Sequence, residues 1–356
     1  MRTEQDVLER LREDGITLPP LSFQLIERQP EGKPGLRLDA IVRACWQNRS
    51  YDFGLEYKSL STPKAFQGAI YQTLEGNRLT GTYPMIMMPY LSDAQLRELE
   101  ARQISGLDLC GNGIVTVPGE LLVFRTGAPN KFPNSAPIKN VYRRASSIVA
   151  RVFLLHPTYP TVNDILQEIA RRDGHVSVAT VSKVLKTLEE DVIVGREKGK
   201  IRLLHPEKLL NRLVENYQPP KITRFFEGKT SLDVDTLIKR LIGKAARFQL
   251  PLVGTGVGST NVYGVMARGE ILSIYCPQLY KLLAGIPAEE TTRFPNIEVI
   301  ETHDETVYFD ARYQQGFPWA SPIQTYLELM AGDERDKQTA EQVKEIIFRE
   351  MEAQTA

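Results

Sequence analysis

The stretch FGLEYKSLSTPKAFQGAIYQ, residues 53–72, places a carboxylate and an ammonium where they can act together. Glu56 and Lys58 stand two positions apart in a predicted strand, so their side chains point to the same face of a sheet. A Ser/Thr/Pro turn follows, and then a predicted helix that carries Gln67 and Gln72. An acid and a lysine at the end of a strand, followed by a helix, are typical of metal-dependent nuclease sites.

A second carboxylate, Asp39, belongs to a preceding predicted strand, GLRLDAIV. Asp39 and Glu56 are hard oxygen ligands, suited to sharing Mg²⁺. The metal would polarise the scissile phosphate and lower the pKa of an attacking water. Lys58 would orient that water or stabilise the extra negative charge in the transition state. With Gln72, these residues form the predicted catalytic set of a nuclease.

The alternative interpretation is a Glu–Lys ion pair on the surface of a sheet, with Asp39 incidental. The tripeptide alone does not decide, because residues 31–33 and 227–229 repeat the Glu-x-Lys pattern in predicted loops. The strand before the motif and the helix after it are what favour a site.

The composition indicates an ordinary globular protein of two or three domains, since the chain has 356 residues, 42% hydrophobic and 25% charged. Lys+Arg and Asp+Glu both number 44, so any surface for nucleic acid must be a local patch. Cys45, Cys110 and Cys276 are far apart and form neither a disulfide framework nor a CxxC metal site. They favour a reducing compartment, and we expect a cytoplasmic protein. The N-terminus reads as a charged amphipathic helix rather than a signal peptide, and no apolar run approaches the roughly 20 residues that span a bilayer.

The chain reads as three segments of an α/β multidomain protein. Residues 1–137 interleave strands with helices, which predicts an α/β sheet covered by helices, and end in the linker GAPNKFPNSAP. Residues 138–217 predict three helices, the last two joined by a turn containing Gly174, and then a β-hairpin around Glu-Lys-Gly-Lys. That order is a winged helix-turn-helix. Residues 218–221, QPPK, mark the next boundary.

The third helix of the middle segment, capped by Ser177, predicts a DNA-reading face. Its core-facing residues at helical spacing are predicted as Val178, Val181, Leu185 and Leu188. The opposite face is small, hydroxyl-bearing or cationic, as a helix in the major groove requires: Ala179, Thr180, Lys183, Lys186 and Thr187. Basic residues on the first helix and the wing are predicted to surround the groove: Arg143, Arg144, Arg196, Lys198, Lys200 and Arg202. The alternative is a solvated cationic face on a helical domain used for dimerisation.

Residues 222–356 mix helices with strands, the latter predicted at EILSIYC, IEVIET and TVYFD. The glycine-rich stretch VGTGVGSTNVYG, residues 253–264, could cradle a phosphate, but nucleotidyl transfer also needs paired carboxylates a strand further on. The next strand has none after Glu270, so we interpret the stretch as an inactive or structural loop. Asp108, in LDLCGNG, is predicted as a buried turn-forming carboxylate.

Taken in order, these pieces resemble the AbiEi-type antitoxin and regulator family in its long form. The resemblance rests on LDAIV…LEYKS…AIYQ, YPMIMMPYLS, ISGLDLCGN, IRLLHPEKLLNRLVENY and SPIQTYLELMAGDERDKQTAEQV, and covers nearly the full length. It implies a restriction-endonuclease-like PD-(D/E)XK domain, a winged helix, and a nucleotidyltransferase-like α+β domain over 222–356 without catalytic acids. It also implies a DNA-binding autorepressor of a type IV toxin–antitoxin system, paired with a nucleotidyltransferase-like toxin. Two features depart from the family: the tail reads AGDERDK where glycines are usual, and the Asp39/Glu56/Lys58 set is more than a repressor needs.

Three functions follow as hypotheses. The first is a sequence-specific regulator that binds double-stranded DNA, as a homodimer because one helix reads too few base pairs for an operator. The second is a Mg²⁺-dependent nuclease targeted by the winged helix. The third is a protein-binding module that neutralises a toxin through residues 222–356. Loss of function with Lys58→Ala or with Lys183→Ala separates the first two.

Overall fold

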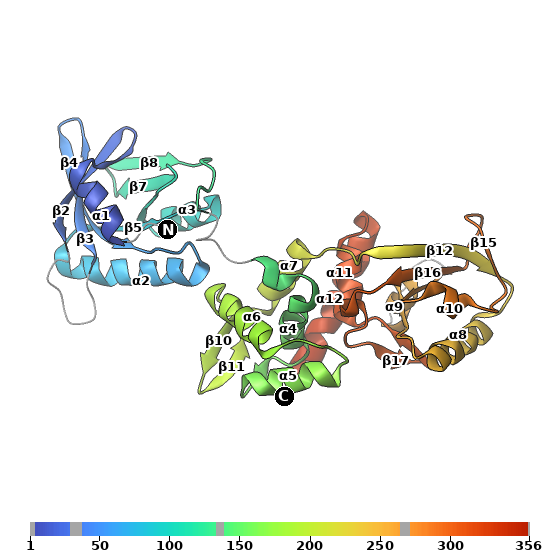
Figure 1. Ribbon diagram of the computed structural model, residues 1–356. Helices are drawn as coiled ribbons and strands as arrows, with labels where there is room; N and C mark the ends of the chain where they lie inside the picture. Colours follow the sequence, from blue (N-terminus) through green and yellow to red (C-terminus); the bar gives the residue numbers. More distant parts are fainter. Residues whose placement is uncertain (1–3, 29–37, 133–138, 264–270, 355–356) are drawn as a thin grey trace. The chain divides into compact units, whose positions relative to one another are not determined.

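The computed structural model describes residues 4–28, 38–132, 139–263 and 271–354, and it is a mixed α/β protein with several sheets (Figure 1). The chain divides into two compact units: residues 1–138 with 190–192, and residues 139–189 with 193–356. The expected α/β, multidomain character is therefore confirmed. Within the described ranges, no helix is both long and apolar enough to cross a membrane.

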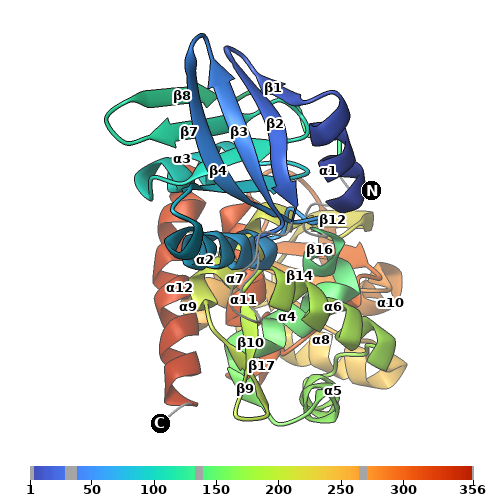
Figure 2. The same ribbon diagram turned by 90° about the vertical axis from the view of Figure 1, so that its left-hand side faces the viewer.

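The first unit is built on one eight-stranded sheet whose strands follow chain order from β1 to β8. Strands β4, β5 and β6 run parallel, and the remaining neighbours are antiparallel (Figure 2). The helices α2 and α3 make the two parallel crossovers. The element bounds are α1 Glu4–Glu13, β1 Ile16–Leu18, β2 Leu21–Arg28, β3 Ala40–Trp46, β4 Arg49–Tyr57, α2 Pro63–Thr80, β5 Tyr83–Met88, α3 Asp93–Ala101, β6 Ser105–Asp108, β7 Gly113–Val117 and β8 Leu121–Arg125.

The central strand β5 is buried on both faces, which explains its unbroken apolar sequence YPMIMM. Met85 and Met87 belong to the core that includes α1, whereas Ile86 and Met88 belong to the core that includes α2 and α3. Helices therefore cover both faces of the sheet. Ser92 caps α3 in a capping box.

The second unit begins with a three-helix segment, residues 139–189, that comprises α4, α5 and α6; a β-hairpin and the helix α7 follow it. A small antiparallel sheet has the order β10-β11-β9. The predicted hairpin is present, with its turn at Lys198 and Gly199, both at positive φ. The bounds are η2 Lys139–Tyr142, α4 Arg144–Leu155, β9 Thr158–Tyr159, α5 Val162–Arg171, α6 Val178–Glu190, β10 Val194–Glu197, β11 Lys200–Leu203 and α7 Pro206–Asn216.

The rest of the second unit is a seven-stranded mixed sheet of order β15-β12-β16-β14-β13-β18-β17 with helices around it. The prediction of a strand at TVYFD is wrong, because residues 305–307 form a short 3-10 helix. The Asp304 carboxylate stabilises this turn by accepting hydrogen bonds from the backbone N–H and the hydroxyl of Thr306. The bounds are β12 Ile222–Thr230, α8 Val234–Phe248, β13 Val253–Thr255, α9 Gly256–Val262, β14 Leu272–Cys276, α10 Leu279–Leu283, β15 Ala288–Glu290, β16 Ile297–Thr302, η3 Glu305–Val307, β17 Arg312–Gln314, β18 Phe317–Trp319, α11 Pro322–Met330 and α12 Glu334–Ala353.

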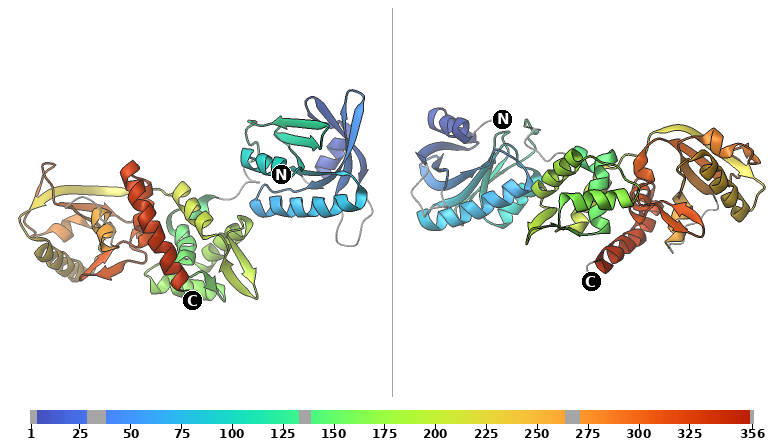
Figure 3. Two further views of the ribbon diagram at one scale, coloured as in Figure 1. Left: turned by 180° about the vertical axis from the view of Figure 1, so that it is seen from behind. Right: turned by 60° about the horizontal axis from the view of Figure 1, so that its bottom comes forward.

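One hydrophobic core serves both parts of the second unit. It joins Val149 and Phe153 of α4 and Leu188 of α6 to Leu327 of α11 and Ile347 of α12. Figure 3 shows α12 running alongside the three-helix segment. The three-helix segment and the C-terminal helices are thus packed as one body.

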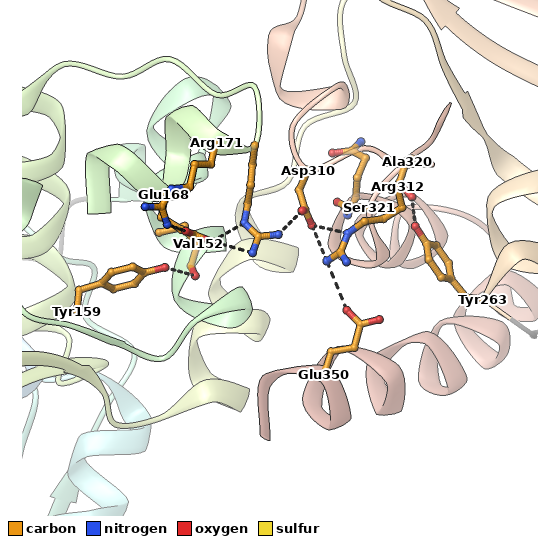
Figure 4. Close-up of polar contacts among 12 residues, drawn as sticks. Val152, Tyr159, Glu168, Arg171, Tyr263, Asp310, Arg312, Ala320, Ser321 and Glu350 are labelled. Atoms are coloured by element: carbon orange, nitrogen blue, oxygen red, sulfur yellow. Dashed lines mark hydrogen bonds and ion pairs between the residues drawn. The ribbon is translucent and has the colours of Figure 1, made fainter. Parts of the chain in front are cut away.

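Ion pairs reinforce this packing at the end of α5. Arg172 donates to Asp310, whose second oxygen accepts from Arg312, and Arg312 also pairs with Glu350 of α12 (Figure 4). The Asp310 side chain is only 4% exposed, so its charge is compensated by two guanidinium groups rather than by water.

Candidate functional site

The acid–lysine site of the first unit is assembled at the end of β4. Glu56 is the penultimate residue of this strand and is 3% exposed. The backbone N–H of Lys58 donates to Met87 O of β5 at 2.9 Å, so Lys58 is held by the parallel pairing of β4 with β5. The Lys58 ammonium lies 2.6 Å from Glu56 Oε1, as two residues on the same face of a strand permit.

Asp39 is brought to Glu56 by backbone hydrogen bonds to β4. Its N–H donates to Leu55 O at 3.0 Å, and its Oδ2 accepts from the N–H of Tyr57 at 2.7 Å. Asp39 directly precedes β3 rather than lying within it, and the first part of its predicted strand, residues 35–37, is outside the described residues. Burial raises the pKa of Asp39 to about 6, and the Tyr57 hydrogen bond and nearby Lys58 oppose that rise.

Burial also raises the pKa of Glu56 to about 7, and the neighbouring charge of Asp39 raises it further, while Lys58 opposes the shift. Glu56 Oε2 is buried and has no hydrogen-bond partner among the described residues. A buried carboxylate oxygen without a partner is costly, and it marks a position where a ligand would be accepted.

The two glutamines of α2 have different partners. The Gln72 side-chain oxygen accepts from the Lys58 ammonium, so the structure brings Gln72 into the predicted set with Glu56 and Lys58. Gln67 donates instead to Glu98 of α3 at 3.0 Å. The site therefore contains Asp39, Glu56, Lys58 and Gln72, as predicted, and Gln67 is directed elsewhere.

The residues present suit Mg²⁺ bound through two carboxylates. Among the described residues, no cluster of three or more His, Cys, Asp or Glu side chains could hold a metal ion. Magnesium, however, is commonly held by one or two carboxylates and completes its shell with water and substrate phosphate. Asp39 and the unpartnered oxygen of Glu56 meet that requirement.

One acidic residue near the site was not predicted from the sequence. Glu4, the first residue of α1, is close enough for its charge to raise the pKa of both Asp39 and Glu56. In the sequence Glu4 is one of several charges on an amphipathic helix, and nothing in its spacing points to β4.

The helix α6 of the second unit presents an exposed arc with a different membership from the predicted one. Lys183, Lys186 and Ala179 are exposed, as predicted. The prediction that Val178 faces the core is wrong, because this side chain is 59% exposed. The prediction that Thr187 lies on the exposed, DNA-facing side is also wrong. This residue is 5% exposed, and its hydroxyl donates to Lys183 O within the helix.

The polar residues at the start of α6 are engaged with each other. The N–H of Thr180 donates to Ser177 Oγ at 3.1 Å, and the two hydroxyl oxygens are 2.9 Å apart. Ser177 thus fulfils its predicted capping role, and Thr180 is half-buried. Ser182, which was not predicted, is exposed on the same side as Lys183. We define the exposed arc as Val178, Ala179, Ser182, Lys183 and Lys186.

Basic residues of the hairpin fall into two groups. Arg196 pairs with Glu189 and Arg202 with Glu197, so their charges are partly compensated. Within the described part of the chain, Lys183, Lys186, Lys198 and Lys200 are exposed and have no ion-pair partner. Four uncompensated ammonium groups therefore lie on α6 and on the hairpin.

Arg143 and Arg144 begin α4. Arg144 lies at positive φ and lines a cavity of about 560 Å³ with Lys221, His303 and Asp304, which follow the three-helix segment in the chain. A role for these two arginines in DNA binding stays a prediction.

The glycine-rich stretch is explained by packing. Residues 253–255 form β13, and α9 follows directly. A Cβ atom on Gly254 or Gly258 would lie 2.5 or 2.3 Å from the Trp319 ring, so no larger residue fits. Thr255 donates to Glu328 of α11, a half-buried carboxylate. Asp108 also matches its prediction, since it is 5% exposed and accepts from the N–H groups of the following turn.

No protein-family model, curated protein or solved structure matches the chain.

Proposed function

We propose that this protein binds double-stranded DNA through α6 and the β10–β11 hairpin, and acts as a cytoplasmic transcriptional regulator of the antitoxin kind. The observation that carries the proposal is the exposed arc of α6, which holds small side chains and two uncompensated lysines and no carboxylate. A helix in the major groove needs small residues for close approach and cations for the phosphates on either side. Lys198 and Lys200 extend the same charge onto the hairpin, where a wing contacts the backbone.

The dimerisation alternative is less well supported. Surfaces that join two copies of a chain are depleted in lysine and enriched in apolar and aromatic residues. Of the described residues of α6, Val178 is the one large hydrophobic residue that is exposed. A homodimer that places two α6 helices one helical turn of DNA apart is part of the proposal, because a single helix reads too few base pairs. A nucleotidyltransferase-like toxin is the proposed protein partner.

The test is a gel-shift titration on the DNA upstream of the protein's own gene. The Lys183→Ala/Lys186→Ala variant should shift the DNA only at a higher protein concentration, while Lys239→Ala, at an exposed lysine on α8, should bind like the wild type. Thermal unfolding of each variant shows that the fold is retained. Equal binding by all three proteins would contradict the proposal.

A second candidate function is Mg²⁺-dependent cleavage of DNA by Asp39, Glu56, Lys58 and Gln72. It is supported by the orphaned, buried Glu56 oxygen beside Asp39. When bound, the metal would supply Lewis acidity toward a phosphate and a water of lowered pKa. Asp39 and Glu56 would hold it, and the Lys58 ammonium would leave Glu56 to stabilise the charge of the transition state.

Nicking of supercoiled plasmid separates the two functions. For a nuclease, nicks require Mg²⁺ and disappear with Lys58→Ala or Gln72→Ala. Gln67→Ala is the matched control, because Gln67 lies on the same helix and bonds to Glu98. A shifted but intact band, unchanged by metal or by Lys58→Ala, would exclude the nuclease and be compatible only with the regulator.

A further inference from the structure

Val178 is an exposed β-branched side chain at the first position of α6, 59% accessible although it is apolar. It contributes little to folding there, because it buries little surface and valine is a poorer helix former than alanine. Its single χ1 angle is nearly fixed in a helix, so it loses little entropy when it contacts a partner. An exposed valine that stabilises nothing internal is suited to an intermolecular contact.

The exposed arc has an internal order along the helix. At about 100° per residue, its five members span about 140° of the circumference. Val178, Ala179 and Ser182 come first along the helix, and Lys183 and Lys186 follow. In helix-turn-helix proteins, the N-terminal residues of the second helix contact base edges. A helix that entered the groove in this way would bring Val178, Ala179 and Ser182 nearest to the bases and the two ammonium groups nearer to the phosphates.

The neighbouring hydroxyls do not compete for that position. Ser177 and Thr180 are hydrogen-bonded to each other and to the helix N-terminus. The apolar group that a base pair presents in the major groove is the C5-methyl of thymine, the partner that alanine and similar side chains contact. Cytosine, guanine and adenine present no methyl group there.

We propose that Val178, flanked by Ala179, packs against a thymine methyl group, so that each half-site of the recognised DNA carries a T·A pair at this position. The proposal rests on the proposed DNA-binding function and deepens it. Val178 is a specificity-determining residue in this view, whereas Lys183 and Lys186 supply affinity for any sequence.

The experiment uses the full chain and a bound duplex recovered by selection from random DNA. Each thymine is replaced in turn by deoxyuridine, which keeps the hydrogen-bonding atoms and lacks only the methyl group. One such replacement in each half-site should weaken binding about fourfold, as expected for one buried methyl. Val178→Ala should bind the parent duplex more weakly and lose the sensitivity to that replacement.

Val234→Ala is the matched control, because Val234 is also the first residue of a helix, α8, and is 58% exposed. It should keep both the affinity and the deoxyuridine sensitivity. The proposal is overturned if no deoxyuridine replacement weakens the wild type, or if Val178→Ala stays equally sensitive at the same thymine. Failure to bind any duplex overturns the DNA-binding function itself, which is a different result.

Discussion

The Lys58 ammonium lies 2.6 Å from one oxygen of Glu56, while the other oxygen of the same carboxylate is buried without a partner among the described residues. The lysine compensates only part of the desolvation of this acid, because burial still raises the pKa of Glu56. A cation on the unpartnered side, shared with Asp39, would complete the compensation.

Mg²⁺ should therefore stabilise the first unit. We expect millimolar Mg²⁺ at pH 8 to raise the melting temperature of the wild type, because the ion binds the folded site and not the unfolded chain. Asp39→Asn and Glu56→Gln should abolish the rise. Asp52→Asn should keep it, since Asp52 on the same sheet pairs with Arg43. Calorimetric scans with and without metal measure the effect, and an unchanged melting temperature in the wild type would exclude the metal site.

Stability should fall as the pH rises through the range in which Glu56 ionises. Its pKa of about 7 in the folded protein is above the ordinary value of 4.5, so the folded state binds the proton more tightly than the unfolded chain. Below pH 4.5 the group is neutral in both states and costs nothing; above pH 7 the folded protein must bury a charge.

The matching variant is Glu56→Gln, which cannot ionise. Between pH 4.5 and 8, its free energy of unfolding should rise relative to the wild type by about 3 kcal/mol, the order expected for a pKa shift from 4.5 to about 7. Urea titrations across that range give the difference curve. Parallel curves for the two proteins would mean that Glu56 titrates normally.

The salt dependence of DNA binding should report the number of lysines that contact phosphates. Each ammonium that neutralises a phosphate releases about one counterion, so the slope of log K against log salt is a measure of these contacts. Lys183→Ala/Lys186→Ala should reduce the slope by about 2 and weaken binding to every sequence alike. Fluorescence anisotropy between 50 and 200 mM salt provides the slopes. Arg202→Ala should change the slope less, because its charge is shared with Glu197.

Asp310→Asn should destabilise the second unit strongly. Asp310 is almost fully buried between Arg172 and Arg312, and loss of its charge leaves these guanidinium groups with only Glu168 and Glu350 as partners. A cost of about 2 kcal/mol is expected for the lost charge-assisted hydrogen bonds. Asparagine tolerates the positive φ of this position, so the variant tests charge rather than backbone strain. Arg171→Ala, at an exposed pair with Glu168, should cost less than about 1 kcal/mol in the same urea titration.

Periodicity in the sequence identified α6 but misassigned the two residues at the edges of its buried face. Val178 and Thr187 lie at opposite edges of the buried arc, where a few degrees decide the environment. Val178 is the first residue of the helix, so no preceding turn covers it. Thr187 can be buried because its hydroxyl is satisfied by Lys183 O, a local bond that a hydropathy pattern does not register.

The acid–lysine site could be predicted because its main members are close in the chain. Glu56 is in β4, Lys58 directly follows that strand, and Gln72 is on the next helix. Asp39 required only the pairing of neighbouring strands β3 and β4. Glu4 could not be found in this way, since its proximity depends on how α1 packs on the sheet, and packing across a core has no short-range signature.

The core that α4 and α6 share with α11 and α12 makes these helices a single cooperative unit of unfolding. A cut after residue 217 would expose Leu188 and Phe153 to water instead of releasing an independent DNA-binding module. Mass action then links these helices: a molecule that binds only the folded form of α11 and α12 also raises the population of folded α6. If α6 binds DNA as proposed, DNA and a ligand of α11 or α12 would thus be thermodynamically coupled through shared packing.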